Sequence, residues 1–170
     1  MTFGPLSNDL VTLKPLVVTD YEALYLVGSD PQIWAQHPDI NRYTKEGFKF
    51  YFDKLMETDE PYLIIRNEDK AIIGATSYYE KEDINRTIAI GYTFLSKCCW
   101  GGFYNSSLKK LMIDTAFTYY DKVVFHVRDN NLRSQSALVK IGARRAQESP
   151  TLLNPTISQY KYVINKTLTS

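Results

Sequence analysis

The first third of the chain combines one alternating segment with apolar residues at helical spacing. Residues 11–15 alternate apolar and polar side chains, which predicts a short strand. Residues 44–56 place apolar side chains three or four positions apart, which predicts an amphipathic helix. The apolar face of that helix consists of Phe48, Tyr51, Phe52, Leu55 and Met56.

Two shorter helices are expected between these segments because their ends carry capping signals. Residues 19–22 have the threonine–glutamate spacing of a capping box, and the helix that they begin is expected to end at Gly28. Asp30 followed by Pro31 has the pattern of an N-cap and a first helical residue, which predicts a second helix through Trp34.

Runs rich in β-branched and aromatic residues dominate the rest of the chain. Residues 62–65 and 71–77 are separated by a polar turn, which predicts a hairpin, and residues 87–95 form a third run. The later elements are expected in the order helix 105–120, strand 123–127, helix 131–141 closed by Gly142, and strands 143–148 and 159–164.

The order of these elements indicates the fold class. The chain is predicted to form one strand, several helices, three strands and then alternating helices and strands. This order fits an α/β (α+β) fold, with a mixed, mostly antiparallel sheet and helices on both faces. No internal repeat, low-complexity tract or long linker divides the sequence. We therefore expect a single domain over residues 1–170.

The composition is typical of one globular domain, and the net charge excludes some classes of binding partner. The chain has 170 residues, of which 44% are hydrophobic and 23% charged. Its formal net charge of +1 lacks the positive excess that binds nucleic acid or an anionic membrane, so neither is expected as a partner. No apolar run approaches the roughly 18 residues that span a bilayer, and the first residues lack the features of a signal peptide. A cytoplasmic location is expected.

The two cysteines, Cys98 and Cys99, are adjacent in the sequence. A disulfide between neighbours is strained, so two reduced thiols are expected. Two thiols without a second cysteine or histidine pair fall short of a four-ligand zinc site, and a covalent acetyl-cysteine would need an adjacent base. Neither a metal nor a cysteine nucleophile is therefore expected.

The segment from Ile90 to Lys110 carries the strongest chemical signal. A strand ends near Leu95, a loop carries Gly101 and Gly102, and a long helix follows. Consecutive backbone N–H groups at such a turn, together with the positive end of the helix dipole, form an anion site suited to a pyrophosphate. On its own, such a turn is equally explained by the backbone freedom of glycine.

A second segment makes the signal specific. Residues 131–143 read N-x-x-S-x-x-A-x-x-x-I-G-A, after I-G-Y-T at 90–93 and W-G-G-x-Y-N at 100–105. With these motifs the chain resembles, over residues 11–148, the GCN5-related N-acetyltransferases (GNAT), in the branch that contains the ribosomal-protein N-terminal acetyltransferases. The resemblance implies a splayed sheet with acetyl-CoA, a co-substrate, in its V-shaped opening.

The resemblance also implies the cofactor contacts. Asn131 would bond the pantetheine arm, and Ser134 would lie near the thioester sulfur, where it could protonate the departing thiolate. Backbone groups of the preceding strand would pair with the arm, and one of its amides would stabilise the oxyanion. The strand residues are Thr93, Phe94 and Leu95, and the pyrophosphate loop consists of Gly101, Gly102, Phe103, Tyr104, Asn105 and Ser106.

The chain departs from the family pattern at two places. Phe103 and Asn105 stand where relatives have glycine, and glycine or alanine. Because Phe103 prefers negative φ, Gly102 is expected to absorb the turn and Asn105 to cap the helix. Ala89 stands where many relatives have a glutamate that deprotonates the amine.

The base that replaces this glutamate is left open. Glu80, Glu82 and Asp83 lie on the loop after the hairpin and could act as the base or simply be solvated. His37 is either a base or a surface or packing residue. His126 lies within an apolar strand and is expected to be a satisfied core residue.

The motifs and the candidate residues together predict which residues bind the amine substrate and what reaction the protein catalyses. Trp34 and Tyr92 are expected to bind the substrate, although Trp34 could equally be a core residue. We expect an N-acetyltransferase that moves an acetyl group from acetyl-CoA to a primary amine, on a small molecule or a protein N-terminus, by direct attack in a ternary complex. Without the usual glutamate, either the acceptor is an amine of low pKa or the reaction is slow. The alternative is a non-catalytic CoA-binding or interaction module on the same fold, and a homodimer is left open.

Overall fold

The computed structural model describes residues 2–37, 39–147, 151–154 and 157–167, and its centre is one mixed sheet. The strands pair in the order β1-β2-β3-β4-β5-β6-β9-β7, with β8 on β9. Among the strands of the described residues, only β5 and β6 pair in parallel, which confirms the expected mixed, mostly antiparallel sheet. The strands are β1 Leu6–Ser7, β2 Val11–Pro15, β3 Glu60–Arg66, β4 Ile72–Glu82, β5 Thr87–Leu95, β6 Lys122–Arg128, β7 Arg144–Arg145, β8 Thr151–Asn154 and β9 Ile157–Asn165.

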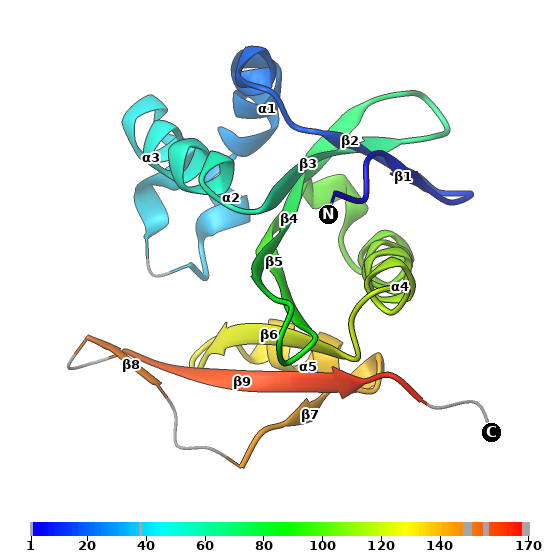
Figure 1. Cartoon of the computed structure of the whole chain (residues 1–170). Helices are drawn as coiled ribbons and strands as arrows, with labels where there is room; N and C mark the ends of the chain where they lie inside the picture. Colours follow the sequence, from blue (N-terminus) through cyan, green and yellow to red (C-terminus); the bar gives the residue numbers. More distant parts are fainter. Residues whose placement is uncertain (1, 38, 148–150, 155–156, 168–170) are drawn as a thin grey trace.

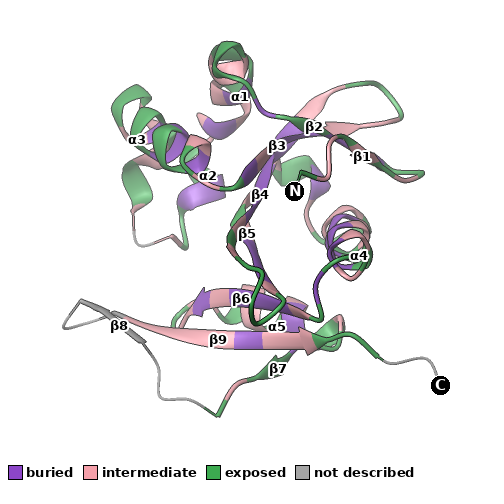
Figure 2. Cartoon of the chain, viewed as in Figure 1, coloured by how far each residue is buried: buried purple, intermediate pink, exposed green. Residues whose placement is uncertain are grey.

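Helices cover both faces of the sheet, and a separate core lies under each group. Leu24, Phe48 and Phe94 belong to the core under α1–α3, whereas Leu108 and Leu138 belong to the core under α4 and α5. Figure 1 shows α1–α3 on one side of β3–β5 and α4 on the other, and Figure 2 shows the buried residues along the strands between them. The helices are α1 Tyr21–Gly28, α2 Pro31–Trp34, α3 Lys45–Met56, α4 Tyr104–Ala116 and α5 Leu132–Lys140, with 3₁₀ turns at Val18–Asp20, Ile40–Tyr43 and Lys97–Cys99.

The ends of α1 differ from the expectation. Thr19 lies in a 3₁₀ turn, and it is the Asp20 carboxylate that accepts a hydrogen bond from the Val17 N–H at 3.1 Å. Gly28 is the last residue of α1 and does not close it with a left-handed turn. A Cβ on Gly28 would lie 2.1 Å from the ring of Phe48, so this glycine is required by packing.

Other predicted ends are confirmed. Asp30 caps α2 by accepting from the Gln32 N–H at 2.9 Å, with proline as the first helical residue. Gly142, at φ 88°, follows α5 as predicted. Two predicted ends are wrong: the helix 105–120 ends earlier, at Ala116, and the strand 143–148 is limited to Arg144–Arg145 within the described residues, which do not include residue 148.

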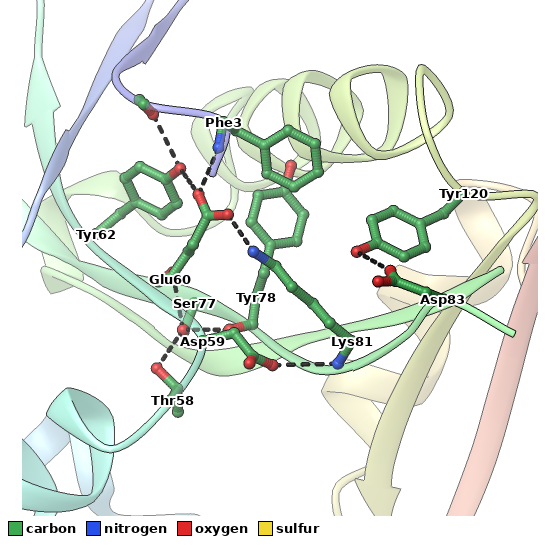
Figure 3. A network of polar contacts seen from close by, with 11 residues as sticks. Phe3, Thr58, Asp59, Glu60, Tyr62, Ser77, Tyr78, Lys81, Asp83 and Tyr120 are labelled. Atoms are coloured by element: carbon green, nitrogen blue, oxygen red, sulfur yellow. Dashed lines mark hydrogen bonds and ion pairs between the residues drawn. The ribbon is translucent and has the colours of Figure 1, made fainter. Parts of the chain in front are cut away.

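A buried polar network ties the N-terminal segment to the start of β3 and the end of β4 (Figure 3). The Glu60 carboxylate pairs with the Lys81 ammonium, accepts from the Phe3 N–H at 2.9 Å and lies 2.7 Å from the Tyr62 hydroxyl. Glu60 is only 7% exposed, so its charge depends on these partners.

We predict that Glu60→Leu lowers the free energy of unfolding by about 3–5 kcal/mol, because it removes the buried carboxylate to which Phe3, Tyr62 and Lys81 all donate. The double variant Glu60→Leu/Lys81→Met should recover part of that loss. Lys14→Met breaks the exposed Lys14–Asp20 pair and should cost less than about 1 kcal/mol. Urea denaturation measures all three, and equal effects of Glu60→Leu and Lys14→Met would contradict this account of the network.

Candidate active site

The sheet opens between β5 and β6. These strands pair only from Thr87 with Lys122 to Ala89 with Val124, although β5 continues to Leu95 and β6 to Arg128. Residues 90–95 therefore turn one backbone edge toward β6 without a ladder of hydrogen bonds. This opening is the V-shaped feature expected from the sequence.

A bulge in β5 accompanies the opening. The register with β4 passes from Ser77–Gly91 to Ala75–Phe94, so β5 carries one extra residue opposite Thr76. Tyr92 takes φ 53°, a conformation that costs a tyrosine on the order of 1–3 kcal/mol. The extra residue shifts the alternation of side chains, so that Thr93 faces α4 while Phe94 joins the core under α1–α3.

Contacts from both faces hold the bulge. On the α3 side, the Tyr51 hydroxyl donates to the Tyr92 carbonyl at 2.6 Å. On the α4 side, the Lys109 amino group donates to Thr93 Oγ1 at 2.9 Å, and that oxygen lies 2.8 Å from Thr76 Oγ1. Two helices on opposite faces therefore fix two adjacent residues of β5, Tyr92 and Thr93.

The loop before α4 presents backbone amides, but its details differ from the prediction. The left-handed residue is Gly101, at φ 71°, and not Gly102. Phe103 occupies the N-cap with φ −84° and no side-chain cap, so the prediction that Asn105 caps the helix is wrong. The Ser107 N–H bonds the Phe103 carbonyl at 2.9 Å. The amides of residues 104–106 precede this first helical bond and have no acceptor within the helix.

Two contacts brace this loop. The Trp100 indole donates to the Leu95 carbonyl at 2.9 Å, and the Arg133 guanidinium lies 4.3 Å from the centre of the Trp100 ring. At the start of α5, Asn131 accepts from the Ser134 N–H at 3.1 Å. The predicted loop and the predicted N-x-x-S motif are thereby brought together at one end of the opening.

The face toward α1–α3 carries an acid and a histidine that pair across β5. Glu80 Oε2 on β4 lies 3.0 Å from His126 Nε2 on β6. On β5 the ring of Tyr79 packs directly on Gly91, where a Cβ would lie 2.8 Å from that ring. The Tyr79 ring also lies 5.3 Å from the Tyr92 ring and 6.1 Å from the His126 ring, measured between centres.

His126 is therefore not the satisfied core residue that its apolar neighbours suggested. Val123, Phe125 and Val127 belong to the core under α4 and α5. Strict alternation places His126 on the other face of β6, half-buried beside Glu80. That alternation was the signal in the sequence that could have identified it.

The other candidate acids are engaged at the turn after β4. Glu82 accepts from the Asn85 side chain at 2.6 Å and from the Thr87 hydroxyl at 3.1 Å. Asp83 accepts from the Tyr120 hydroxyl at 3.2 Å. Trp34 is buried in the core, and its indole donates to the Gly28 carbonyl at 2.7 Å. Tyr92, in contrast, is exposed on the Glu80–His126 side.

His37 lines a cavity of about 470 Å³ between the end of α2 and the start of α5. Burial, and then the charges of Arg42 and Arg128, lower its pKa to about 4. Its Nδ1 accepts from the Asp39 N–H at 3.0 Å. His37 is therefore neutral at pH 7 and a weak base.

Cys98 is exposed, Cys99 is buried, and both are free thiols. The described part of the chain holds no group of three or more side chains suited to a metal ion. Across the same residues, no helix is long and apolar enough to cross a membrane.

Solved structures share this architecture. A GCN5-related N-acetyltransferase from Brucella melitensis superposes with a TM-score of 0.84 at 15% identity, over 97% of this chain and 80% of that one. A GNAT-family acetyltransferase from Bacillus anthracis gives 0.76 at 17% identity, over 95% and 98%. The spermidine N-acetyltransferase from Vibrio cholerae, in complex with CoA and spermine, gives 0.68 at 16% identity, over 93% and 96%.

The curated proteins contain no match to this chain. The family model described as the acetyltransferase (GNAT) domain matches residues 11–144. That span runs from β2 to the start of β7 and includes the opening, the bulge and all three sequence motifs. The chain belongs to the GNAT acetyltransferase family.

Proposed function

We propose that this protein is an acetyl-CoA-dependent N-acetyltransferase that acetylates a primary amine by direct attack in a ternary complex. The observation that carries the proposal is the opening between β5 and β6, which ends at three backbone amides of α4 without helical acceptors. Membership of the GNAT family supports acetyl transfer. The placement in the ribosomal-protein branch stays a prediction.

The residues present fit the cofactor. The amides of residues 104–106 and the left-handed Gly101 suit a pyrophosphate, because aligned N–H groups at a helix start favour negative charge. The open edge of β5 at residues 93–95 suits the peptide-like pantetheine arm. Asn131 and Ser134 at the start of α5 would contact the same arm, with Ser134 as the proton donor to the thiolate.

Glu80 and His126 are the best candidates for the base. In the proposed reaction the amine nitrogen bonds to the thioester carbon, the C–S bond breaks, and the amine loses its proton to His126. Glu80, 3.0 Å away, would orient the imidazole. The carboxylate thus comes from the bulged end of β4 rather than from the Ala89 position on β5.

Arg128, one of two arginines on this face, favours an acceptor with a negative group near its amine. The other, Arg42, already pairs with the Asp39 carboxylate at 3.4 Å and lies 5.5 Å from the Trp34 ring and 5.1 Å from the Tyr51 ring. Arg128 follows His126 by two positions on β6, and burial together with the charge of Arg42 lowers its pKa. Among the described residues Arg128 takes part in no ion pair. Such a site disfavours a polyamine and suits an amino acid-like molecule or a peptide N-terminus.

The test is release of the CoA thiol from acetyl-CoA in the presence of separate amines. We expect turnover with amino acid-like amines or peptide N-termini, and much less with spermidine or with a lysine side chain. CoA-dependent thermal stabilisation without thiol release from any amine would contradict the enzyme and support the non-catalytic module.

We predict that His126→Ala lowers kcat/KM for the amine by about a hundredfold or more, since general base catalysis contributes about 10²–10⁴. Glu80→Gln should have a smaller effect in the same direction, with the Kd for CoA unchanged in both. Glu82→Gln is the matched control and should retain activity. Full activity of His126→Ala would remove this pair from the mechanism.

We also predict an acid-sensitive contribution of His37 to stability. Its pKa is about 4 in the folded protein and 6.5 without burial, so the unfolded chain binds more protons between these values. Stability is therefore complete above about pH 6.5 and declines as pH falls toward 4. In urea denaturation, His37→Asn should flatten the loss between pH 6.5 and 4, and a slope identical to that of the wild type would refute the assignment.

A further inference from the structure

Lys109 is a buried lysine on a helix face where an apolar residue would be expected. Its exposed fraction is 8%, and it lies among the core residues that α4 presents to the sheet. The next residue, Lys110, has a side chain that is 76% exposed and pairs with Asp114 at 2.5 Å. The two lysines differ only in which side of α4 they occupy, so Lys110 is a natural control.

The Lys109 amino group lies where β5 and β6 have separated. It is 2.9 Å from Thr93 Oγ1 on β5 and 5.5 Å from the centre of the Phe125 ring on β6. Both residues lie beyond the last paired residues of these strands, Ala89 and Val124. The amino group therefore lies at the α4 side of the opening, between β5 and β6, next to residues 90–95 of β5, whose edge toward β6 is unpaired.

This amino group has more donors than acceptors. An ammonium carries three N–H bonds, and within the described residues Thr93 Oγ1 is the one hydrogen-bond acceptor that it contacts. No described carboxylate forms an ion pair with it. Burying an amine in this way disfavours its charged form and destabilises the fold, whereas methionine would fill the same space without that cost.

We propose that Lys109 is a positioning residue for the cofactor arm: it donates to a carbonyl oxygen of pantetheine in the opening and holds Thr93 in the bulge. The arm offers amide carbonyls, which are the acceptors that a buried amino group lacks. This inference rests on the proposed binding of acetyl-CoA in the opening.

If Lys109 contacts the cofactor arm, CoA binding should change the protonation of its amino group. Burial lowers the pKa of Lys109 to about 7, so most of these groups are neutral at pH 8. Carbonyl acceptors favour the ammonium, so binding of the arm should take up a proton there. The other titratable side chains in this core are Cys99, Tyr62, Tyr78, Tyr120 and Tyr162, with Tyr104 and Tyr160 partly buried against it. Tyr78 already donates to the Met112 carbonyl at 2.6 Å, and burial raises its pKa.

Calorimetry with two ligands tests the proposal. CoA carries the arm, whereas 3′-phosphoadenosine 5′-diphosphate has the same nucleotide and phosphates without it. Lys109→Met should weaken CoA binding by about tenfold or more and leave the armless nucleotide unchanged, because a hydrogen bond to a charged group is worth about that factor. Lys110→Met should change neither ligand.

A second measurement separates positioning from simple packing. At pH 8, CoA binding by the wild type should show proton uptake when the heats are compared in two buffers of different ionisation enthalpy, and Lys109→Met should show none. Thr93→Val, which removes the acceptor, should also weaken CoA binding, and Thr93→Ser should restore it.

Three outcomes overturn the proposal. Lys109→Met could bind CoA as the wild type does, could lose CoA and the armless nucleotide equally, or could keep the proton uptake. If Lys109→Met does not fold, the Thr93 pair decides, and wild-type affinity in Thr93→Val would reject the role. A wild type that binds neither ligand would instead overturn the proposed function itself, and this inference with it.

Discussion

A tyrosine at φ 53° costs free energy, and the structure offsets that cost with contacts from both faces of the sheet. Tyr51 holds the carbonyl of Tyr92 from the α3 side, and Lys109 holds Thr93 from the α4 side. The extra residue interrupts the pairing with β4 within the segment where β5 has already left β6. The chemistry of the opening depends on this irregularity, because a bulge changes the face to which the following side chains point.

The bulge also separates two chemical environments across one strand. Toward α4 and α5 lie Thr93, Lys109 and the amides at the start of α4, which are mostly donors. Toward α1–α3 lie Tyr92, the Glu80–His126 pair and the arginines. In the proposed reaction the thioester approaches from the first side and the amine from the second, so the two substrates meet only in the opening.

Local patterns in the sequence predicted the elements well. Alternation, helical spacing and the Asp30–Pro31 cap depend on near neighbours, and the structure confirms the strands and helices that they predicted. The contacts within the site depend on distant segments. Glu80 and His126 are 46 positions apart, and the bulge that orients Tyr92 has no glycine to reveal its positive φ. The burial of Lys109 was not predicted, because lysines on amphipathic helices normally lie on the solvent side. Its amino group lies beside the opening, which depends on how distant strands pair.

The central claim is that the unpaired edge of β5 holds the cofactor, and amide hydrogen exchange with and without CoA tests it most directly. The account predicts that CoA slows amide exchange in two separate segments, residues 92–95 on β5 and residues 104–106 at the start of α4. Amide exchange in the paired strands β2 and β3 should not change. Saturating CoA that binds without slowing exchange in residues 92–95 would contradict it.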